Sequence, residues 1–429
     1  MKRLLILLLF PLTMFSQDWI QLGQDIDGES AEDFSGWQVA LNDDGDILAI
    51  GAMDNDGVNG EQSGHVRVYE WDGSSWNQVG DDIDGEAEGD ESGYVMSLNS
   101  SGSIVAIGAR HNDGNGSNSG HVRVYEWDGN SWNQLGDDID GEAEGDQFGF
   151  SLSINSSGDI LAIGGEGNDD NGIGSGHVRV YEWDGENWNQ LGSDIDGEAS
   201  GDSFGYDVSI NNDGNIIAVG AIGNDANFTP TPASGVGHVR VFEWDGLNWN
   251  QLGQDIDGES PGDISGFSVS VNGLGNIVLI GAKYNDANGE QSGHARVYEW
   301  DGENWNQLGD DINGEAPGDN LGQSVSINDA GNIISIGAWG NDNNGSDSGH
   351  VRVYEWDGSS WNQLGQYILG ETEGDGSGRA VALNSEGDIV ASGAGYNNDN
   401  GNNSGHVRVY GYDSDGDGIA NEVDNCVDD

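Results

Sequence analysis

The chain has 429 residues, with 77 Asp and Glu against 12 Lys and Arg, and a formal net charge of −65. A surface of that charge repels the phosphates of nucleic acids and anionic lipid headgroups, so neither is expected as a partner. It attracts cations instead, which makes divalent metal ions candidate ligands.

Residues 1–17 have the pattern of a secretory signal peptide. Lys2 and Arg3 precede the apolar run 4–10, and small or polar residues follow as far as Gln17. The apolar run is too short to span a bilayer, and no other segment is apolar enough to do so. We therefore expect a secreted or cell-surface protein without a transmembrane segment.

The remainder of the chain repeats one unit seven times. A motif of the form Gly-His-Val-Arg-Val-Tyr recurs at intervals of 56 residues, with one interval of 61 that reflects an insertion within 227–235. Its histidines are His65, His121, His177, His238, His294, His350 and His406. A fixed period of this length indicates a repeat architecture, in which each unit buries its apolar surface against its neighbours.

Each unit is predicted to form four antiparallel strands. In the second unit, 95–99 alternates like a strand, 103–109 is a nearly continuous apolar run, and 121–127 alternates again. Asp128-Gly129 is a hairpin signal, and 132–139 supplies the fourth strand. No segment shows helical periodicity, so the fold class is all-β. Four strands repeated seven times predict a seven-bladed β-propeller, with an open β-solenoid as the alternative.

The two ends of the repeat region favour the closed ring. The first unit is preceded by a lone fourth strand, 19–26, and the seventh ends after its third strand, 406–412. If these fragments pair, the ring closes and leaves no long unpaired edge, whereas a solenoid would need capping units. We therefore predict a propeller over 18–412, monomeric and closed by its N-terminal strand.

In such a ring, the loops from strand four to strand one and from strand two to strand three lie on the same face. These loops are long, acidic and rich in glycine, as in the recurring Asp-Ile-Asp-Gly-Glu and Asn-Asp-x-Asn-Gly motifs. Loops on a rigid scaffold commonly carry function. We expect an extracellular protein or glycan ligand to bind on this surface, which we call the long-loop face.

Several of these segments resemble a known repeat. Phe148-Gly149 followed by 162–164, and Phe204-Gly205 followed by Gly220-Ala221, are similar to the FG-GAP repeat of integrin α-chain propellers. The resemblance implies an extracellular propeller used for adhesion or ligand binding, often with calcium. The chain departs from the family because Ser or Leu replaces the Phe in five units. Its turns between strands one and two are also too short for the integrin-type calcium loop.

The segment 413–429 is predicted to begin a calcium-binding tail. Its acidic spacing supplies oxygens at loop positions 1, 3, 5, 9 and 12, with glycine at position 6 and a backbone carbonyl at position 7. The candidate ligands are Asp413, Asp415, Asp417, Ile419, Asn421 and Asp424. With Cys426, the only cysteine, the segment resembles a thrombospondin type 3 repeat, a family in which such cysteines form disulfides. The alternative is a plain acidic linker.

Side chains that occur in every unit are interpreted first as architecture. The histidines would lie too far apart around a ring to share one ion, which favours a hydrogen-bonded structural role. The strand arginines are expected to staple blades by pairing with loop residues such as Asp90, Asp146 and Asp202. Tryptophan pairs at the third turn are interpreted as cross-strand contacts rather than sugar platforms. The loop aspartates could bind calcium or simply form turns.

The sequence favours a non-catalytic binding or adhesion protein. No Ser-His-Asp order, zinc spacing or phosphate loop stands apart from the repeat. The alternative is a carbohydrate-binding or carbohydrate-cleaving propeller, because a catalytic carboxylate pair could be hidden among so many acids.

Overall fold

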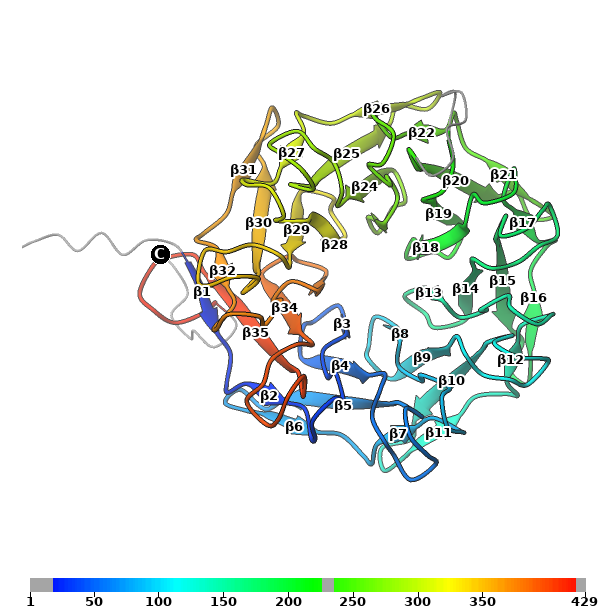
Figure 1. Cartoon of the computed structure of the whole chain (residues 1–429), viewed down its shortest axis with the longest axis horizontal. Coiled ribbons are helices and arrows are strands. Elements are labelled where there is room, and N and C mark those ends of the chain that lie inside the picture. The colour runs from blue at the N-terminus through cyan, green and yellow to red at the C-terminus, as the bar shows by residue number, and fades with distance from the viewer. Residues whose placement is uncertain (1–17, 226–234, 422–429) are drawn as a thin grey trace, which may run out of the picture.

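The computed structural model describes residues 18–225 and 235–421. The predicted signal peptide, Asp424 and Cys426 lie outside these ranges. In the described part of the chain, 35 strands form seven separate sheets arranged around one axis (Figure 1). No helix in these ranges is long and apolar enough to cross a membrane. The predicted all-β, seven-bladed propeller is confirmed.

Blades 1 to 7 are numbered along the chain, and their strands are numbered outward from the axis. The first strands are β3 (Gln38–Leu41), β8 (Val95–Leu98), β13 (Ser151–Ile154), β18 (Phe204–Ile210), β23 (Ser268–Val271), β28 (Leu321–Ile327) and β33 (Ala380–Leu383). The second strands are β4 (Ile47–Ala52), β9 (Ile104–Ala109), β14 (Ile160–Gly165), β19 (Ile216–Ala221), β24 (Ile277–Ala282), β29 (Ile333–Ala338) and β34 (Ile389–Ala394). The third strands are β5 (His65–Trp71), β10 (His121–Trp127), β15 (His177–Trp183), β20 (His238–Trp244), β25 (His294–Trp300), β30 (His350–Trp356) and β35 (His406–Asp413).

The fourth strand of every blade is interrupted, so that each sheet contains five strands. Its two parts are β6 (Trp76–Gln78) and β7 (Ile83–Asp84), β11 (Trp132–Gln134) and β12 (Ile139–Asp140), β16 (Trp188–Gln190) and β17 (Ile195–Asp196), β21 (Trp249–Gln251) and β22 (Ile256–Asp257), β26 (Trp305–Gln307) and β27 (Ile312–Asn313), β31 (Trp361–Gln363) and β32 (Ile368–Leu369), and β1 (Asp18–Gln21) and β2 (Ile26–Asp27).

The interruption of the fourth strand corrects the continuous strand predicted over 132–139. Gln134 pairs with Tyr125 and Ile139 pairs with Val122. The fourth strand therefore advances by five residues where the third strand advances by three. Two residues are therefore in excess, and the backbone loops out through Gly136, whose φ of +82° is left-handed. A glycine adopts this conformation without the steric cost that other residues incur.

The ring closes as predicted. In blade 7, β1 and β2 both pair with β35, and Trp19 lies opposite Tyr412. The two rings are 5.2 Å apart, and the buried Trp19 indole donates a hydrogen bond to the Leu364 carbonyl of blade 6 at 2.9 Å. The N-terminal strand thus completes the last sheet and contacts the neighbouring blade.

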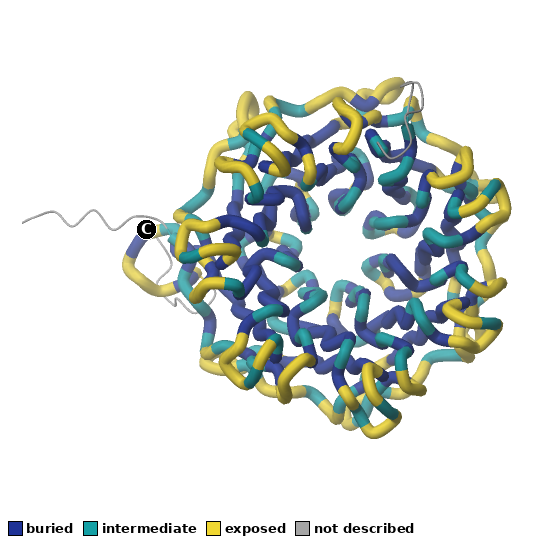
Figure 2. The backbone as a smooth tube through the Cα atoms, in the orientation of Figure 1, coloured by how far each residue is buried: buried dark blue, intermediate teal, exposed yellow. Residues whose placement is uncertain are grey.

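The core lies between blades. A typical cluster combines Val122 of blade 2 with Phe148, Leu161 and Ile163 of blade 3, all fully buried or nearly so. Figure 2 shows this buried layer inside a rim of exposed loops. Glycines allow the blades to approach closely, because a Cβ on Gly108 would lie 2.3 Å from the carbonyl oxygen of Gly149. The two glycine positions of the repeat therefore mark where neighbouring backbones touch.

The arginine staples exist, but their acceptors differ from those predicted. Arg179 of blade 3 donates to the Asp140 carbonyl of blade 2 at 3.2 Å, and its other terminal nitrogen lies 3.3 Å from Glu142. The predicted partner, Asp146, instead accepts the Ala143 amide of its own loop at 3.0 Å. Every residue has a backbone carbonyl, so the sequence does not indicate which one accepts the hydrogen bond. The prediction therefore named an aspartate side chain.

The tryptophan pairs have the predicted structural role. Trp183 and Trp188 lie opposite one another with ring centroids 5.4 Å apart. The Trp188 indole donates to the Leu135 carbonyl of the preceding blade at 2.9 Å. Each pair therefore closes a hairpin and also joins two blades.

Candidate functional site

The long-loop face forms as expected. In blade 3, the loop between strands two and three contacts the loop after strand four, where Asn171 donates to the Gly197 carbonyl at 2.9 Å. Ser200 donates back to the Ile173 carbonyl at 2.7 Å. Similar contacts join these loops in other blades, as between Asn115 and Gly141. The acidic loops are thus held together on one side of the ring.

Several positions on this face vary from blade to blade, although most of the unit repeats, and two of them lie at the ends of the inner strands. The first follows the second glycine of the strand-one motif and holds Trp37, Tyr94, Phe150, Tyr206, Phe267, Gln323 and Arg379. The second follows strand two and holds Met53, Arg110, Glu166, Ile222, Lys283, Trp339 and Gly395. Both positions lie where innermost strands meet the long-loop face, so their side chains surround the axis.

The first variable position forms an arc of aromatic rings. The centroids of Trp37 and Tyr94 are 6.3 Å apart, and the next contacts, through Phe150, Tyr206 and Phe267, span 5.0–5.3 Å. Gln323 and Arg379 complete the circle. Together these side chains line a cavity of about 120 Å³ at the mouth of the central channel, which is room for several water molecules. We call this cavity and its rim the axial cup.

All of the non-repeating positive charge gathers at the axial cup. Outside residues 1–17 the chain has ten Lys and Arg, and seven of them are the staple arginines. The other three stack on the aromatic arc: Arg379 lies 3.8 Å from the centroid of Trp37, Arg110 lies 3.7 Å from that of Tyr94, and Lys283 lies 3.5 Å from that of Phe267. Cations favour the negative face of an aromatic ring, and these contacts fix the three side chains in place.

The three cations differ in their pairing. Arg110 forms an ion pair with Glu91 at 2.8 Å. Lys283 donates to the side-chain oxygen of Gln323 at 3.1 Å. Within 18–225 and 235–421, no carboxylate oxygen lies within 4.0 Å of the charged nitrogens of Lys283 or Arg379. Burial, reinforced by the charge of Arg379, lowers the pKa of Lys283 to about 7. Two basic side chains without a carboxylate partner are unusual in so acidic a protein.

Two carboxyl groups also belong to this region. Burial raises the pKa of Glu166 to about 7, against the opposing effect of Arg110. The surrounding protein desolvates Asp207, which lines the cup, and raises its pKa to about 7. Asp207 accepts the Val269 amide of the next blade at 2.7 Å and is fixed by that contact. The cup therefore offers cations, aromatic faces and hydrogen-bond acceptors together.

The predicted tail ligands fall into two groups. Asp413 is buried at the end of β35, and its two carboxylate oxygens accept the amides of Gly416 and Gly418 at 2.7 and 2.8 Å. Asp415 and Asp417 lie on the exposed curve of the same loop. Their carboxylates accept backbone amides of the loop, Asp415 from Asp417 at 3.0 Å and Asp417 from Ile419 at 2.8 Å, so the loop is curled on itself.

The rest of the described tail is placed by one buried alanine and by hydrogen bonds of Asn421, whose amide donates to the Tyr412 carbonyl at 2.9 Å. Ala420 is fully buried in the core cluster that contains Leu22, while Ile419 is partly exposed. The Asn421 side-chain oxygen accepts the Ser414 amide at 3.0 Å. The sixth predicted ligand, Asp424, lies outside the described residues. No thrombospondin type 3 repeat was found in the chain.

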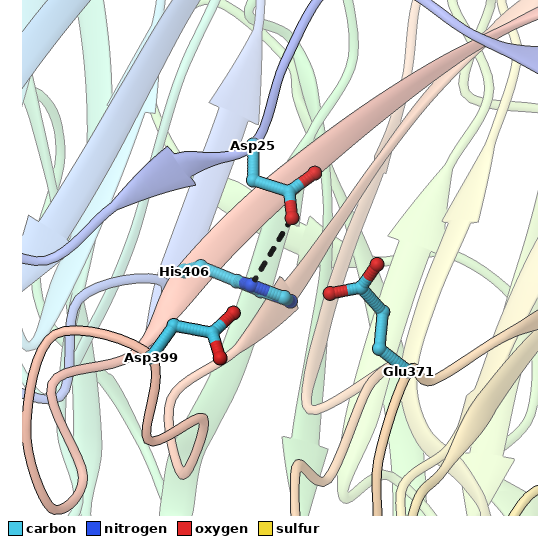
Figure 3. Close-up of side chains that lie close together, drawn as sticks. All are labelled: Asp25, Glu371, Asp399 and His406. Carbon is cyan, nitrogen blue, oxygen red and sulfur yellow. Dashed lines mark ion pairs between the residues drawn. The ribbon is translucent and has the colours of Figure 1, made fainter.

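The repeated histidines are not simply hydrogen-bonded, in contrast to the prediction. Both ring nitrogens of the buried His177 lack a hydrogen-bond partner among the described residues. Burial, followed by the charge of Arg179, lowers the pKa of His177 to about 4. Each imidazole instead faces carboxylates, and His406 lies 3.9 Å from Asp25 (Figure 3).

These histidine and carboxylate groups could hold metal ions. In blade 7, one ligand atom from each of Asp25, Glu371, Asp399 and His406 lies within 4.8 Å of the others. Similar groups surround four other repeated histidines: His65, His121, His177 and His238. In blade 6 the aspartate is replaced by Tyr367, whose hydroxyl donates to Glu315 at 2.6 Å. The prediction considered one ion shared by all seven histidines and did not include a local group within a single blade.

The fold is that of a seven-bladed propeller, and the axial cup is its candidate binding site. Residues 194–240 and 313–354 match the model of the FG-GAP repeat. The matched segments run from the outer strand of one blade through the first three strands of the next, so the chain carries FG-GAP repeats in a seven-bladed ring. No curated protein matches the chain.

Proposed function

We propose that this chain is an exported, non-catalytic binding protein that holds an extracellular ligand at the axial cup of its long-loop face. One observation carries the proposal: the residues of the first variable position line one cavity at the axis, and Arg110 and Lys283 of the second stack on its rings. The repeat architecture does not require these particular aromatic and cationic side chains, because other blades carry different residues at the same positions, and their gathering around one cavity points to a ligand. FG-GAP repeats are consistent with a binding role.

Calcium is the cation proposed for the tail. The Asp413 loop has the oxygen spacing that a calcium loop requires and is curled by hydrogen bonds to Asp413, while Asp415 and Asp417 are exposed. Bound calcium would fix the path of the chain beyond Ala420, which packs against the closure strand. Its role is therefore structural, and the ligand site at the axis is separate from it.

A carbohydrate ligand is the second candidate, and the aromatic arc specifically favours it. Ring faces stack on sugars, and Glu166 and Asp207, with pKa values near 7, are suited to accept hydrogen bonds from hydroxyl groups. Carboxyl groups with pKa values near neutrality also serve as general acids in carbohydrate-cleaving enzymes. An assay for cleavage of any saccharide that binds would separate a lectin from an enzyme.

The proposal is tested by ligand screening with a cup variant. The protein without residues 1–17 is applied to a glycan array and to extracellular-matrix proteins, with calcium and with a chelator. Phe150→Ala removes one ring of the arc and should abolish specific binding, whereas Leu247→Ala, at an exposed outer position, should leave it intact. Binding that survives Phe150→Ala would place the ligand elsewhere on the molecule.

A further inference from the structure

The axial cup has the chemistry to select one kind of ligand, and this inference rests on the proposed function. A protein with a net charge of −65 disfavours anions everywhere except where its few cations are concentrated. All three cations outside the repeat lie in the cup, and two of them have no carboxylate partner within 4.0 Å in the described ranges. The cup is thus the place where an anionic group meets basic side chains that have no carboxylate partner.

The aromatic arc restricts the ligand further. Phe150, Tyr206 and Phe267 form a continuous series of rings with centroids 5.0–5.1 Å apart. Such a lining suits the apolar face of a sugar ring, while the side-chain amide nitrogen of Gln323, whose oxygen accepts from Lys283, can donate to a hydroxyl group in the same cavity. Neighbouring carboxylates such as Glu91 and Glu166 disfavour a polyanion, so the ligand carries few charges.

We propose that the axial cup binds a uronic acid residue of an extracellular polysaccharide, with its carboxylate held by Arg379 and Lys283 and its ring face against the aromatic arc. A guanidinium pairs with a carboxylate through two parallel hydrogen bonds, and a lysine adds a point charge. Arg379 is positioned for this by its stacking on Trp37 and Lys283 by its stacking on Phe267. An acidic peptide offers the same carboxylate but no ring face.

The test is isothermal titration calorimetry of the protein without residues 1–17, with EDTA present so that calcium cannot bridge carboxylates. The ligands are trisaccharides of galacturonate, glucuronate and mannuronate, the methyl ester of each, and an acetylated Asp-Asp peptide. We expect at least one uronate to bind, and its uncharged ester to bind about tenfold or more weakly.

Arg379→Gln and Lys283→Met should each weaken uronate binding by about tenfold or more. The matched control is Arg110→Gln, which removes a cation of the same rim that Glu91 already neutralises, and should weaken binding less. Thermal unfolding midpoints equal to that of the unaltered protein would show that these variants fold.

Three outcomes would overturn the inference. Equal binding of a uronate and its ester, or no effect of Arg379→Gln on uronate binding, would show that the cup does not recognise the carboxylate charge. If Phe150→Ala nevertheless abolished binding, the cup would remain the binding site. Preference for the acidic peptide would replace the saccharide with a protein ligand. Failure of all three uronates to bind would refute the uronate assignment. The proposed binding function would still be tested separately by the glycan array and the extracellular-matrix proteins.

Discussion

Acidification should destabilise this protein through its repeated histidines. In six blades the histidine pKa is lowered from 6.5 to about 4, chiefly by burial and then by the neighbouring arginine, and that of His406 is also lowered. A group that binds protons more weakly when folded favours the unfolded state in acid. Its stabilising contribution is therefore complete above pH 6.5 and is lost progressively as the pH falls toward 4.

The magnitude follows from the two pKa values of His177. At pH 5 the unfolded imidazole is almost fully protonated and the folded one is mostly neutral, which costs about 2 kcal/mol of unfolding free energy. At pH 7.5 the cost is close to zero. Replacing His177 with glutamine removes the titrating group, so relative to the unaltered protein the variant should gain about 2 kcal/mol between pH 7.5 and pH 5.

Denaturant unfolding at the two pH values measures this difference. Tyr181→Phe is the matched control in the same strand, because burial raises the pKa of Tyr181 and its phenol stays neutral throughout. Its effect on stability should be the same at both pH values. A His177→Gln effect that does not change with pH, or changes in the opposite direction, would refute the burial argument.

Three further predictions concern closure, stapling and the tail. Trp19→Ala should lower the free energy of unfolding by about 3–5 kcal/mol. The effect should be comparable with that of Trp76→Ala at the same position of blade 1. A negligible change in stability would mean that β1 does not pack against blade 6. Arg179→Met should lower the thermal midpoint through loss of about 1–3 kcal/mol, since the Asp140 carbonyl would lose its donor; an unchanged midpoint would contradict the staple. Asp415→Asn should weaken calcium binding in titration calorimetry, and equal affinity would show that the Asp413 loop is not the site.

The ring and its closure could be predicted because they depend on periodicity. The 56-residue interval sets the blade, and the unmatched fragments at 19–26 and 406–412 require each other. The break in the fourth strand could not be predicted. It arises because the fourth strand has two more residues than the third between the positions that pair with Tyr125 and Val122, and only the pairing register shows this. The staple acceptor was missed for a similar reason, since it is the Asp140 carbonyl rather than a side chain.

The axial cup was missed although the sequence contains its signal. Comparing the seven units position by position would have set Arg110, Lys283 and Arg379 apart from the staple arginines. Their convergence depends on the ring geometry, which places the end of strand two beside the start of strand one at the axis. The prediction considered the side chains that all seven units share, whereas the axial cup is formed by side chains that differ between units.

Closure of the ring is the claim on which the axial cup depends, and an engineered disulfide tests it most directly. Trp19 and Tyr412 lie directly opposite each other on antiparallel strands, a separation that a disulfide can bridge. In a Cys426→Ser background, Trp19→Cys with Tyr412→Cys should oxidise to a monomer without free thiols. Persistent free thiols, or disulfide-linked dimers at low protein concentration, would show that the ends of the repeat region do not meet.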